Sequence, residues 1–511
     1  MSDAQRSVRF TRGASYLITQ SLGVNLVQIV AFVILARLIS TREMGILAVL
    51  SLITATCQTF GTLSISSAVT KFVAENAARS ETDMMAAAFY QALRFALLIS
   101  LPVVALVYGA APYLALHLLG DVSYAGIFRV LAVDVFIYAG ANPLLTGALL
   151  GLHKFRETAI VGLIVGGLIR QSLIIGLIIL TRNFVGLVYA WVLSDASAAV
   201  IYFVLVFRNL GRPRFDFSLA RLLRFSIPLT FSNGAAYAQS WFDRVLLVVF
   251  VPLSVLGVYN ATLTAFGVLQ NISIAMSSML FPAYSSLQSK EDGSNMGEAA
   301  RLAIRYSTLL LIPLALGLLA ASKPALTLFV GESYSNGTVP LMILSGVFAI
   351  TVIGSTALPP VLLALGKTRL TATIMVVSVI ISLAAAYVLL PTWGIVAASA
   401  ARGLAMVISA VLTIYIVGKM IPLNLESRSI LRTLFAGIVM AVVVYAVELV
   451  RYGKLLLPVY VAVGGVVYLV MLRVLRAVDI EDVELLRGLL GERFAPLCEL
   501  FSWIVAPRPR R

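Results

Sequence analysis

Charged side chains stand inside long apolar stretches of this sequence, and they are the residues that could perform chemistry there. An arginine or aspartate at the centre of a membrane helix costs at least about 2.5–3.5 kcal/mol, so such residues usually face a cavity and serve a function. Arg170, in the middle of the apolar segment 158–180, has no short route to a membrane surface and is the strongest candidate for facing a cavity. The arginines singled out inside such segments are Arg37, Arg94, Arg129, Arg170, Arg244 and Arg402.

Acids are fewer in the same stretches, where they comprise Asp134, Asp195, Asp243 and Glu448. One interpretation is internal pairing, in which Asp134 neutralises Arg129 or an arginine of a neighbouring helix and Asp243 pairs across the bundle. Another is that Asp134, Asp195 or Asp243 couples transport to sodium ions or protons. Pairing alone leaves a positive surplus, which predicts an anionic ligand. The planar guanidinium fork suits phosphate oxygens.

Position along each segment gives a second explanation for some of these residues. Arg94 and Arg305 lie near the ends of their segments, where a long side chain can extend to the interface. The same explanation applies to Arg37, Arg129 and Glu448. The candidate substrate-binding residues are Arg170, Arg37, Arg244, Arg402, Arg129, Arg94 and Arg305.

Composition places most of the chain in lipid. Of its 511 residues, 60% are hydrophobic and 12% are charged, and the mean hydropathy is +0.99. An average soluble domain is about 45–50% apolar and about 25% charged. The apolar stretches can each cross a hydrocarbon core of about 30 Å and are too long for barrel strands, so we expect helices.

These stretches predict an all-α integral membrane protein with about 14 transmembrane helices, arranged as two pseudo-symmetric six-helix lobes plus two extra helices. The predicted domains are an N-lobe (1–210), a C-lobe (219–420), helices 13 and 14 (428–476) and a cytoplasmic amphipathic tail (477–511). The apolar segments are 13–39, 45–73, 85–109, 124–149, 158–180, 185–207, 225–250, 257–283, 302–322, 340–365, 370–390, 394–418, 430–450 and 455–473.

Basic residues gather at both termini and in every second loop, as in the linker from Arg208 to Arg224. The positive-inside rule places these loops in the cytoplasm. We therefore expect a multi-pass protein of the cell (plasma) membrane with cytoplasmic N- and C-termini. The net charge of +15 then reflects orientation and contact with membrane lipids, and we expect no nucleic acid partner.

Two halves of the sequence resemble each other at an offset of about 211–213 residues. RFALLISLP (94–102) corresponds to RYSTLLLIP (305–313), and LLGLHKFR (149–156) corresponds to LLALGKTR (362–369). Six helices per half is an even number, so both halves enter the membrane in the same direction. Such a parallel repeat predicts a substrate site between the halves.

Catalytic constellations are missing from the sequence. It has no Walker A loop, no HExxH, no nucleophile elbow and no acid pair at metal spacing. All loops are short, so no soluble catalytic domain is expected. We expect a secondary transporter that is not an enzyme, and no catalytic residue, metal or cofactor is assigned.

The segment ARLISTREMG resembles the first loop of the polysaccharide and oligosaccharide-lipid flippases of the multidrug/oligosaccharidyl-lipid/polysaccharide exporter superfamily. The matching residues are Arg37, Leu38, Glu43, Met44 and Gly45.

Further segments are similar to the same family. They are TKFVAENAARSE at the end of the second helix, the turn GLHKFR after the fourth, and FDRVLLVVFVPLSVLGVYNA, which carries Asp243, Arg244, Gly257 and Tyr259. The resemblance covers the whole chain in helix count and layout.

The resemblance implies a flippase that moves a polyprenyl- or dolichyl-pyrophosphate-linked oligosaccharide from the inner to the outer leaflet, by alternating access through a cationic central cavity. The partners implied are this lipid-linked anionic glycan and membrane lipids. Candidate protein partners are a glycosyltransferase or a polymerase, and we expect the protein itself to be a monomer. Two alternatives from the same superfamily are an ion-coupled multidrug antiporter and a lipid II flippase. The drug branch usually depends on an acid in the first helix, and this sequence has none there.

Overall fold

The computed structural model describes residues 3–288, 293–423 and 426–478, and within these ranges all regular secondary structure is helical. Twelve helices there are long and apolar enough to cross a membrane. One of them, α17 (Thr368–Gly418), covers two predicted segments, because its backbone breaks at Gly394, where φ is 51°. The prediction of an all-α, multi-pass membrane protein is confirmed. From residue 479 onward, the predicted amphipathic tail (477–511) lies outside the described residues.

The chain divides into two compact units, Met1–Gly257 and Val258–Arg511. The first contains the helices α1 (Asp3–Leu38), α2 (Thr41–Phe60), α3 (Ile65–Ala78), α4 (Thr82–Gly109), α5 (Ala111–Leu114), η1 (Ala115–Leu119), η2 (Val122–Tyr124), α6 (Ala125–Val135), η3 (Phe136–Ala141), α7 (Asn142–Gly151), α8 (Phe155–Val161), η4 (Gly162–Ile169), α9 (Arg170–Thr181), α10 (Gly186–Leu210) and α11 (Leu219–Phe250).

The second unit begins within α12 (Leu253–Gln288). It continues with α13 (Gly293–Ala320), α14 (Ser322–Phe329), η5 (Glu332–Gly337), α15 (Thr338–Val352), η6 (Ile353–Ala357), α16 (Pro359–Ala364), α17, α18 (Ser427–Val450), η7 (Lys454–Leu456) and α19 (Leu457–Leu475).

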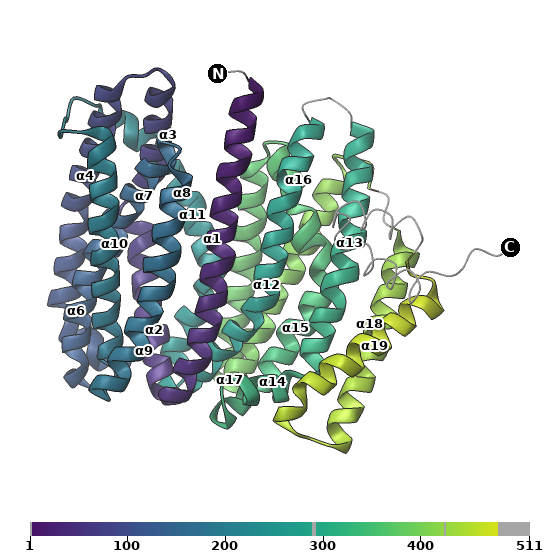
Figure 1. Ribbon diagram of the computed structural model, residues 1–511. Helices are drawn as coiled ribbons and strands as arrows, with labels where there is room; N and C mark the ends of the chain where they lie inside the picture. The colour runs from purple at the N-terminus through teal and green to yellow at the C-terminus, as the bar shows by residue number, and fades with distance from the viewer. Residues whose placement is uncertain (1–2, 289–292, 424–425, 479–511) are drawn as a thin grey trace. The chain divides into compact units, whose positions relative to one another are not determined.

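In the first unit, α4, α6 and α10 pack against one another, and α11 packs on α2 and α3 (Figure 1). Its core is made of small and aromatic side chains such as Ala88, Phe89 and Leu144, none of which is exposed. In the second unit α18 and α19 form a hairpin that packs on α13 (Figure 1). Because α11 belongs to the first unit, the compact units do not divide the chain where the predicted lobes do. The lobes stay a prediction.

The sequence repeat reappears as matching helix ends. The fourth predicted helix of each half ends in a left-handed residue, His153 (φ 57°) or Gly366 (φ 70°). The hydrogen bonds around them also match: His153 N donates to the oxygen of Leu150 at 3.0 Å, and Gly366 N donates to that of Leu363 at 3.0 Å. Local backbone geometry is therefore repeated within each half.

The residues of the ARLISTREMG motif build the start of α2. Ser40 caps the helix and Glu43 completes a capping box, in which the carboxylate of Glu43 accepts from Ser40 N at 2.7 Å and from its hydroxyl at 2.8 Å. Gly45 allows close packing, since a Cβ there would lie 1.9 Å from the backbone oxygen of Leu253. Gly257 approaches the oxygen of Thr41 in the same way, at 2.0 Å. The motif thus serves a structural purpose.

Candidate functional site

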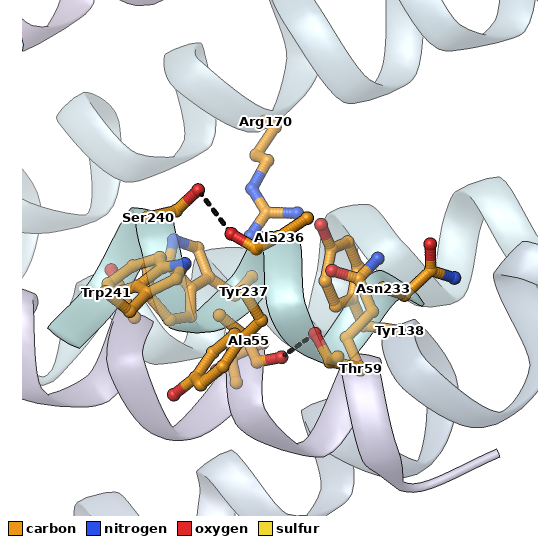
Figure 2. A pocket seen from close by; sticks show the side chains of 13 residues that line it. Ala55, Thr59, Tyr138, Arg170, Asn233, Ala236, Tyr237, Ser240 and Trp241 are labelled. Atoms are coloured by element: carbon orange, nitrogen blue, oxygen red, sulfur yellow. Dashed lines mark hydrogen bonds between the residues drawn. The ribbon is translucent and has the colours of Figure 1, made fainter. Parts of the chain in front are cut away.

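A polar cavity of about 450 Å³ lies within the first unit, between α11 and several of the helices that are long and apolar enough to cross a membrane. Its volume falls in the range of about 300–1,000 Å³ typical of small-molecule sites. Figure 2 shows its lining, which combines one guanidinium, four aromatic rings and several amide and hydroxyl groups. The lining residues are Ser51, Thr54, Ala55, Gln58, Thr59, Tyr138, Arg170, Trp191, Asn233, Ala236, Tyr237, Ser240 and Trp241.

Two helices supply most of this lining through one face each. On α2 the lining residues from Ser51 to Thr59 are spaced by three or four, and on α11 the residues from Asn233 to Trp241 have the same spacing. Residues at this spacing share one face of an α-helix. The two helices pack on each other, and the hydroxyls of Thr56 and Tyr237 form a hydrogen bond between them. The cavity is therefore bounded by two polar helix faces.

Many of the hydroxyls in the lining are anchored to their own helix. Thr59 donates to the oxygen of Ala55 at 2.9 Å, and Ser240 donates to that of Ala236 at 2.9 Å (Figure 2). Such bonds satisfy the hydroxyl inside the apolar layer, while its oxygen can still accept from a ligand.

Two of the lining residues lie in or directly after irregular helix turns. Tyr138 lies within the π-helical η3, and Arg170 follows directly after the π-helical η4. η4 contains Gly162, Gly166 and Gly167, and glycine permits the wider turn. π-helical turns frequently accompany functional sites, because they change the direction of the side chains that follow.

Arg170 is the guanidinium of the cavity. Its Nη1 donates to both carboxylate oxygens of Asp195, at 2.9 and 2.8 Å. The guanidinium carbon also lies 5.5 Å from the ring centre of Tyr138 and 5.3 Å from that of Trp191. The side chain is 17% exposed. The aromatic faces and the carboxylate together fix the guanidinium at the cavity wall.

Asp134, on α6, stands next to this pair. It is fully buried and interacts electrostatically with both Asp195 and Arg170. None of the described residues donates a hydrogen bond to either of its carboxylate oxygens. The proposed pairing of Asp134 with Arg129 is not seen; Arg129 is exposed and stacks on Tyr108, with its guanidinium carbon 5.7 Å from the ring centre.

Other predicted site residues of the first unit lie outside the cavity lining. Arg37 and Arg94 are exposed, and Arg94 stacks on Phe215 at 5.7 Å. Arg244 is half-buried and stacks on the lining residue Trp241 at 4.2 Å. Asp243 is fully buried, and its Oδ1 accepts from the backbone N of Arg244 at 2.8 Å.

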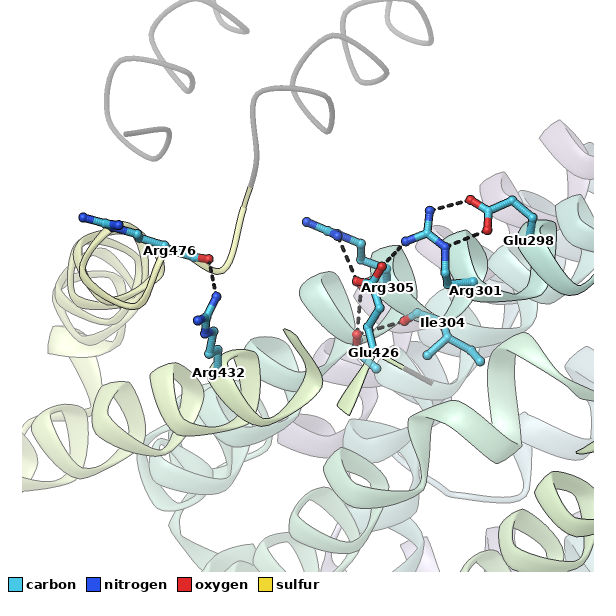
Figure 3. A network of polar contacts seen from close by, with 8 residues as sticks. Glu298, Arg301, Ile304, Arg305, Glu426, Arg432 and Arg476 are labelled. Carbon is cyan, nitrogen blue, oxygen red and sulfur yellow. Dashed lines mark hydrogen bonds and ion pairs between the residues drawn. The ribbon is translucent and has the colours of Figure 1, made fainter. Parts of the chain in front are cut away.

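Two predicted arginines belong to the second unit. Arg402 is buried on α17. Arg305 pairs with Glu426, with Nη1 at 2.9 Å from Oε2, and Arg301 joins the same carboxylate while also pairing with Glu298 (Figure 3). This cluster ties α13 to the start of α18. The substrate-binding roles of all seven arginines stay predictions.

The polar faces of α2 and α11, and the hydrogen bond between Tyr237 and Thr56, were not predicted from the sequence. The signal was present as hydroxyl and amide residues at helical spacing within apolar segments. No described group of three or more His, Cys, Asp and Glu side chains could hold a metal ion.

A family model for polysaccharide biosynthesis proteins matches residues 34–339, more than half of the chain. The probable low-salt glycan biosynthesis flippase Agl15 of Haloferax volcanii is 24% identical over 285 residues, which cover 55% of this chain and 57% of that protein. The succinoglycan biosynthesis transport protein ExoT of Rhizobium meliloti is 26% identical over 332 residues, covering 64% and 63%. Each match thus spans less than two thirds of the relative.

A solved structure of the lipid II flippase MurJ, in an inward closed conformation, is similar over 89% of this chain and 98% of that chain, with a TM-score of 0.72. The two sequences are 13% identical, so the likeness concerns the fold. The family match, covering α2 to the start of α15, includes every residue that lines the cavity. The chain therefore belongs to the polysaccharide biosynthesis protein family, and its fold is that of a multi-pass membrane transporter.

Proposed function

We propose that this protein is a flippase that moves a polyprenyl- or dolichyl-pyrophosphate-linked oligosaccharide from the inner to the outer leaflet of the cell membrane by alternating access. The family match and the two relatives named for glycan biosynthesis support a carbohydrate cargo. The orientation rule supports cytoplasmic termini.

The composition of the cavity carries the proposal. A sugar offers apolar C–H faces and a rim of hydroxyls. The lining offers Tyr237 and Trp241, whose rings stack on each other with centroids 6.3 Å apart, and beside them the amides of Gln58 and Asn233. Aromatic rings with nearby amides suit a sugar better than they suit an apolar drug.

We give Arg170 a specific part in binding the cargo. Both of its hydrogen bonds to Asp195 come from Nη1. A guanidinium has five N–H donors, so donors on Nε and Nη2 are available to a sugar hydroxyl or a phosphate oxygen. Since Asp195 balances its charge, Arg170 provides directed hydrogen bonds more than a free positive charge.

The physics of the membrane favours this direction of movement. A pyrophosphate cannot cross hydrocarbon unaided, and an anion that leaves a negative interior gains about 2.3 kcal/mol per charge per 100 mV. The prenyl chain can stay in lipid while the head group passes through the protein.

Reconstitution tests the proposal. Purified protein in liposomes is given defined pyrophosphate-linked oligosaccharides, and their transfer across the bilayer is measured. We expect transfer by the wild type and about fivefold slower transfer by Trp241→Ala, because an aromatic contact contributes about 1 kcal/mol. Trp393→Ala is the matched control, since Trp393 is 62% exposed on α17.

Several outcomes of this assay would contradict the flippase proposal. Efflux of organic cations without any transfer of lipid-linked sugar would favour the drug antiporter. Equal slowing by Trp393→Ala and Trp241→Ala would remove the cavity from the proposed mechanism. Lipid II is tested in the same assay, and its transfer in place of the oligosaccharide lipids would favour the second alternative, a lipid II flippase.

A further inference from the structure

Three charged side chains meet inside the first unit, at the wall of the cavity. Arg170 on α9 donates to both oxygens of Asp195 on α10, and Asp134 on α6 lies within hydrogen-bonding reach of Asp195. Their exposed fractions are small: 0% for Asp134 and 5% for Asp195. We call Asp134, Asp195 and Arg170 the acid–arginine group.

Hydrogen bonding is incomplete at Asp134. No described residue donates to its Oδ1 or Oδ2, although both atoms are buried. Two ionised carboxylates can only accept, so no hydrogen bond can form between Asp134 and Asp195 unless one of them carries a proton. A single proton on either carboxyl would satisfy the pair, and a buried polar group without a partner is costly.

The charges around Asp134 and Asp195 also favour one proton bound between them. The charged groups that act on Asp134 are Asp195 and Arg170, and those that act on Asp195 are Arg170 and Asp134. Among the described residues of the packed neighbours, η3 contributes the phenol of Tyr138, and the charged residues of α2 (Arg42, Glu43) and α4 (Asp83, Arg94) are not among the groups that act on either acid. With both acids ionised the group carries a net charge of −1 in a low-dielectric interior. Adjacent carboxylates in such sites share one proton.

We propose that the acid–arginine group is a proton-binding site, and that an anionic ligand of the cavity binds together with the proton. With the proton bound, the group is neutral and Arg170 can donate to an anion. Without it, the net negative charge lies at the cavity wall and repels an anion. Linkage is reciprocal, so binding of the anion must draw in a proton.

The coupling step rests on the proposed role of the cavity as the cargo site; the proton site itself does not. Atoms and charges balance simply: one proton from solvent joins the oxygen of Asp134 or Asp195, and no covalent bond of the cargo changes. A proton carried with a pyrophosphate head cancels one of its negative charges, which eases its passage and also removes about 2.3 kcal/mol per 100 mV of the driving force from the membrane potential.

Infrared spectroscopy tests the proton site without any ligand. The wild type should show the carbonyl stretch of a protonated carboxylic acid near neutral pH, and Asp134→Asn should remove that signal. Asp195→Asn is the second variant, and it should remove the signal as well. Glu448→Gln is the matched control, since Glu448 is another buried acid, 7% exposed on α18. A band that survives both aspartate variants overturns the proposal.

Calorimetry tests the coupling. The probe is a sugar sulfate, whose charge stays constant over the pH range, titrated into the purified protein in buffers of different ionisation heat. We expect uptake of about one proton per bound probe and a dissociation constant that rises by up to about tenfold per pH unit. Asp134→Asn should remove both effects while Glu448→Gln keeps them.

The outcomes are separable. Binding of the probe without proton uptake overturns the coupling and leaves the flippase proposal standing. Absence of probe binding, together with an infrared band that depends on Asp134, counts against the cavity as the cargo site and supports the proton site. Binding that depends on sodium in place of protons overturns the proposal.

Discussion

The two halves of the chain share their backbone design but differ in the charges they bury. The offset of 213 residues that relates His153 to Gly366 equates Asp134 with Val347 and Arg170 with Leu383. Alignment of Gly186 with Gly394, at the start of the sixth helix of each half, equates Asp195 with Gly403. All three members of the acid–arginine group thus have uncharged counterparts.

Packing supports this correspondence. A Cβ built on Gly403 would lie 3.1 Å from Cγ2 of Val347, so the counterparts of Asp195 and Asp134 are neighbours in the second half. The same helix pairing therefore tolerates either two apolar residues or two carboxyls. Only the first half has carboxyls at these two positions, and therefore only the first half needs a cation there to compensate them. The comparison suggests that the repeat sets the scaffold, whereas the charged group serves a purpose special to the first half.

Removal of Arg170 alone should have the largest effect on stability. Arg170→Leu leaves Asp134 and Asp195 without a cation, and breaking a buried ion pair costs about 3–5 kcal/mol. We expect a lower midpoint of thermal unfolding in detergent and loss of transport. The matched control is Leu383→Ala at the counterpart position, which is 40% exposed and should change the free energy of unfolding by about 0.5 kcal/mol or less. Unchanged stability of Arg170→Leu would show that the two acids do not depend on it.

Replacing all three members of the acid–arginine group by uncharged residues, as at their counterparts in the second half, should affect stability less than Arg170→Leu does. The triple variant Asp134→Val, Arg170→Leu, Asp195→Ala removes all three charges of the acid–arginine group together. Apolar replacement of a buried ionic group is often neutral or stabilising by about 1–4 kcal/mol. We expect unfolding near the wild-type temperature, with transport still absent. Full transport by this variant would contradict any functional role of the group.

Sequence alone predicted the helices well because crossing a bilayer is a local requirement of length and polarity. The offset between the halves was also visible, since turns such as those at His153 and Gly366 depend on a few neighbouring residues. Arg170 was singled out from the sequence as a charge deep in its segment. Its location at a cavity wall follows from the structure.

Pairing could not be predicted, because it depends on which helix faces which. Asp195 lies 25 residues after Arg170 in the chain, and Asp134 lies on a third helix. Because Asp195 pairs with Arg170, the surplus of arginines in the sequence does not by itself give a free positive charge at Arg170. The stacking of Arg129 on Tyr108 also depends on the arrangement of the helices. The polar faces of α2 and α11 escaped notice because hydroxyl residues satisfy themselves on their own helix and are common in membrane segments.

Arg94 and Arg305 allow the smallest test of the comparison, because the sequence repeat makes them counterparts. Arg305 is 13% exposed and pairs with Glu426, whereas Arg94 is exposed and stacks on Phe215. A partly exposed ion pair contributes about 1 kcal/mol and an exposed cation–π contact about 0.5 kcal/mol. We expect Arg305→Ala to lower the free energy of unfolding by about 1 kcal/mol, and Arg94→Ala by about half as much.

Further variants and the ionic strength distinguish the ion pair of Arg305 from the cation–π contact of Arg94. Glu426→Gln should cost more than Arg305→Ala, because it also breaks the ion pair with Arg301, and the double variant should cost little more than Glu426→Gln alone. Raising the ionic strength should shrink the effect of Arg305→Ala, since partly exposed pairs are screened. If Arg94→Ala instead cost more than Arg305→Ala, the exposed arginine would have to bind something beyond Phe215. In that case matching positions in the repeat would differ in function as well as in packing.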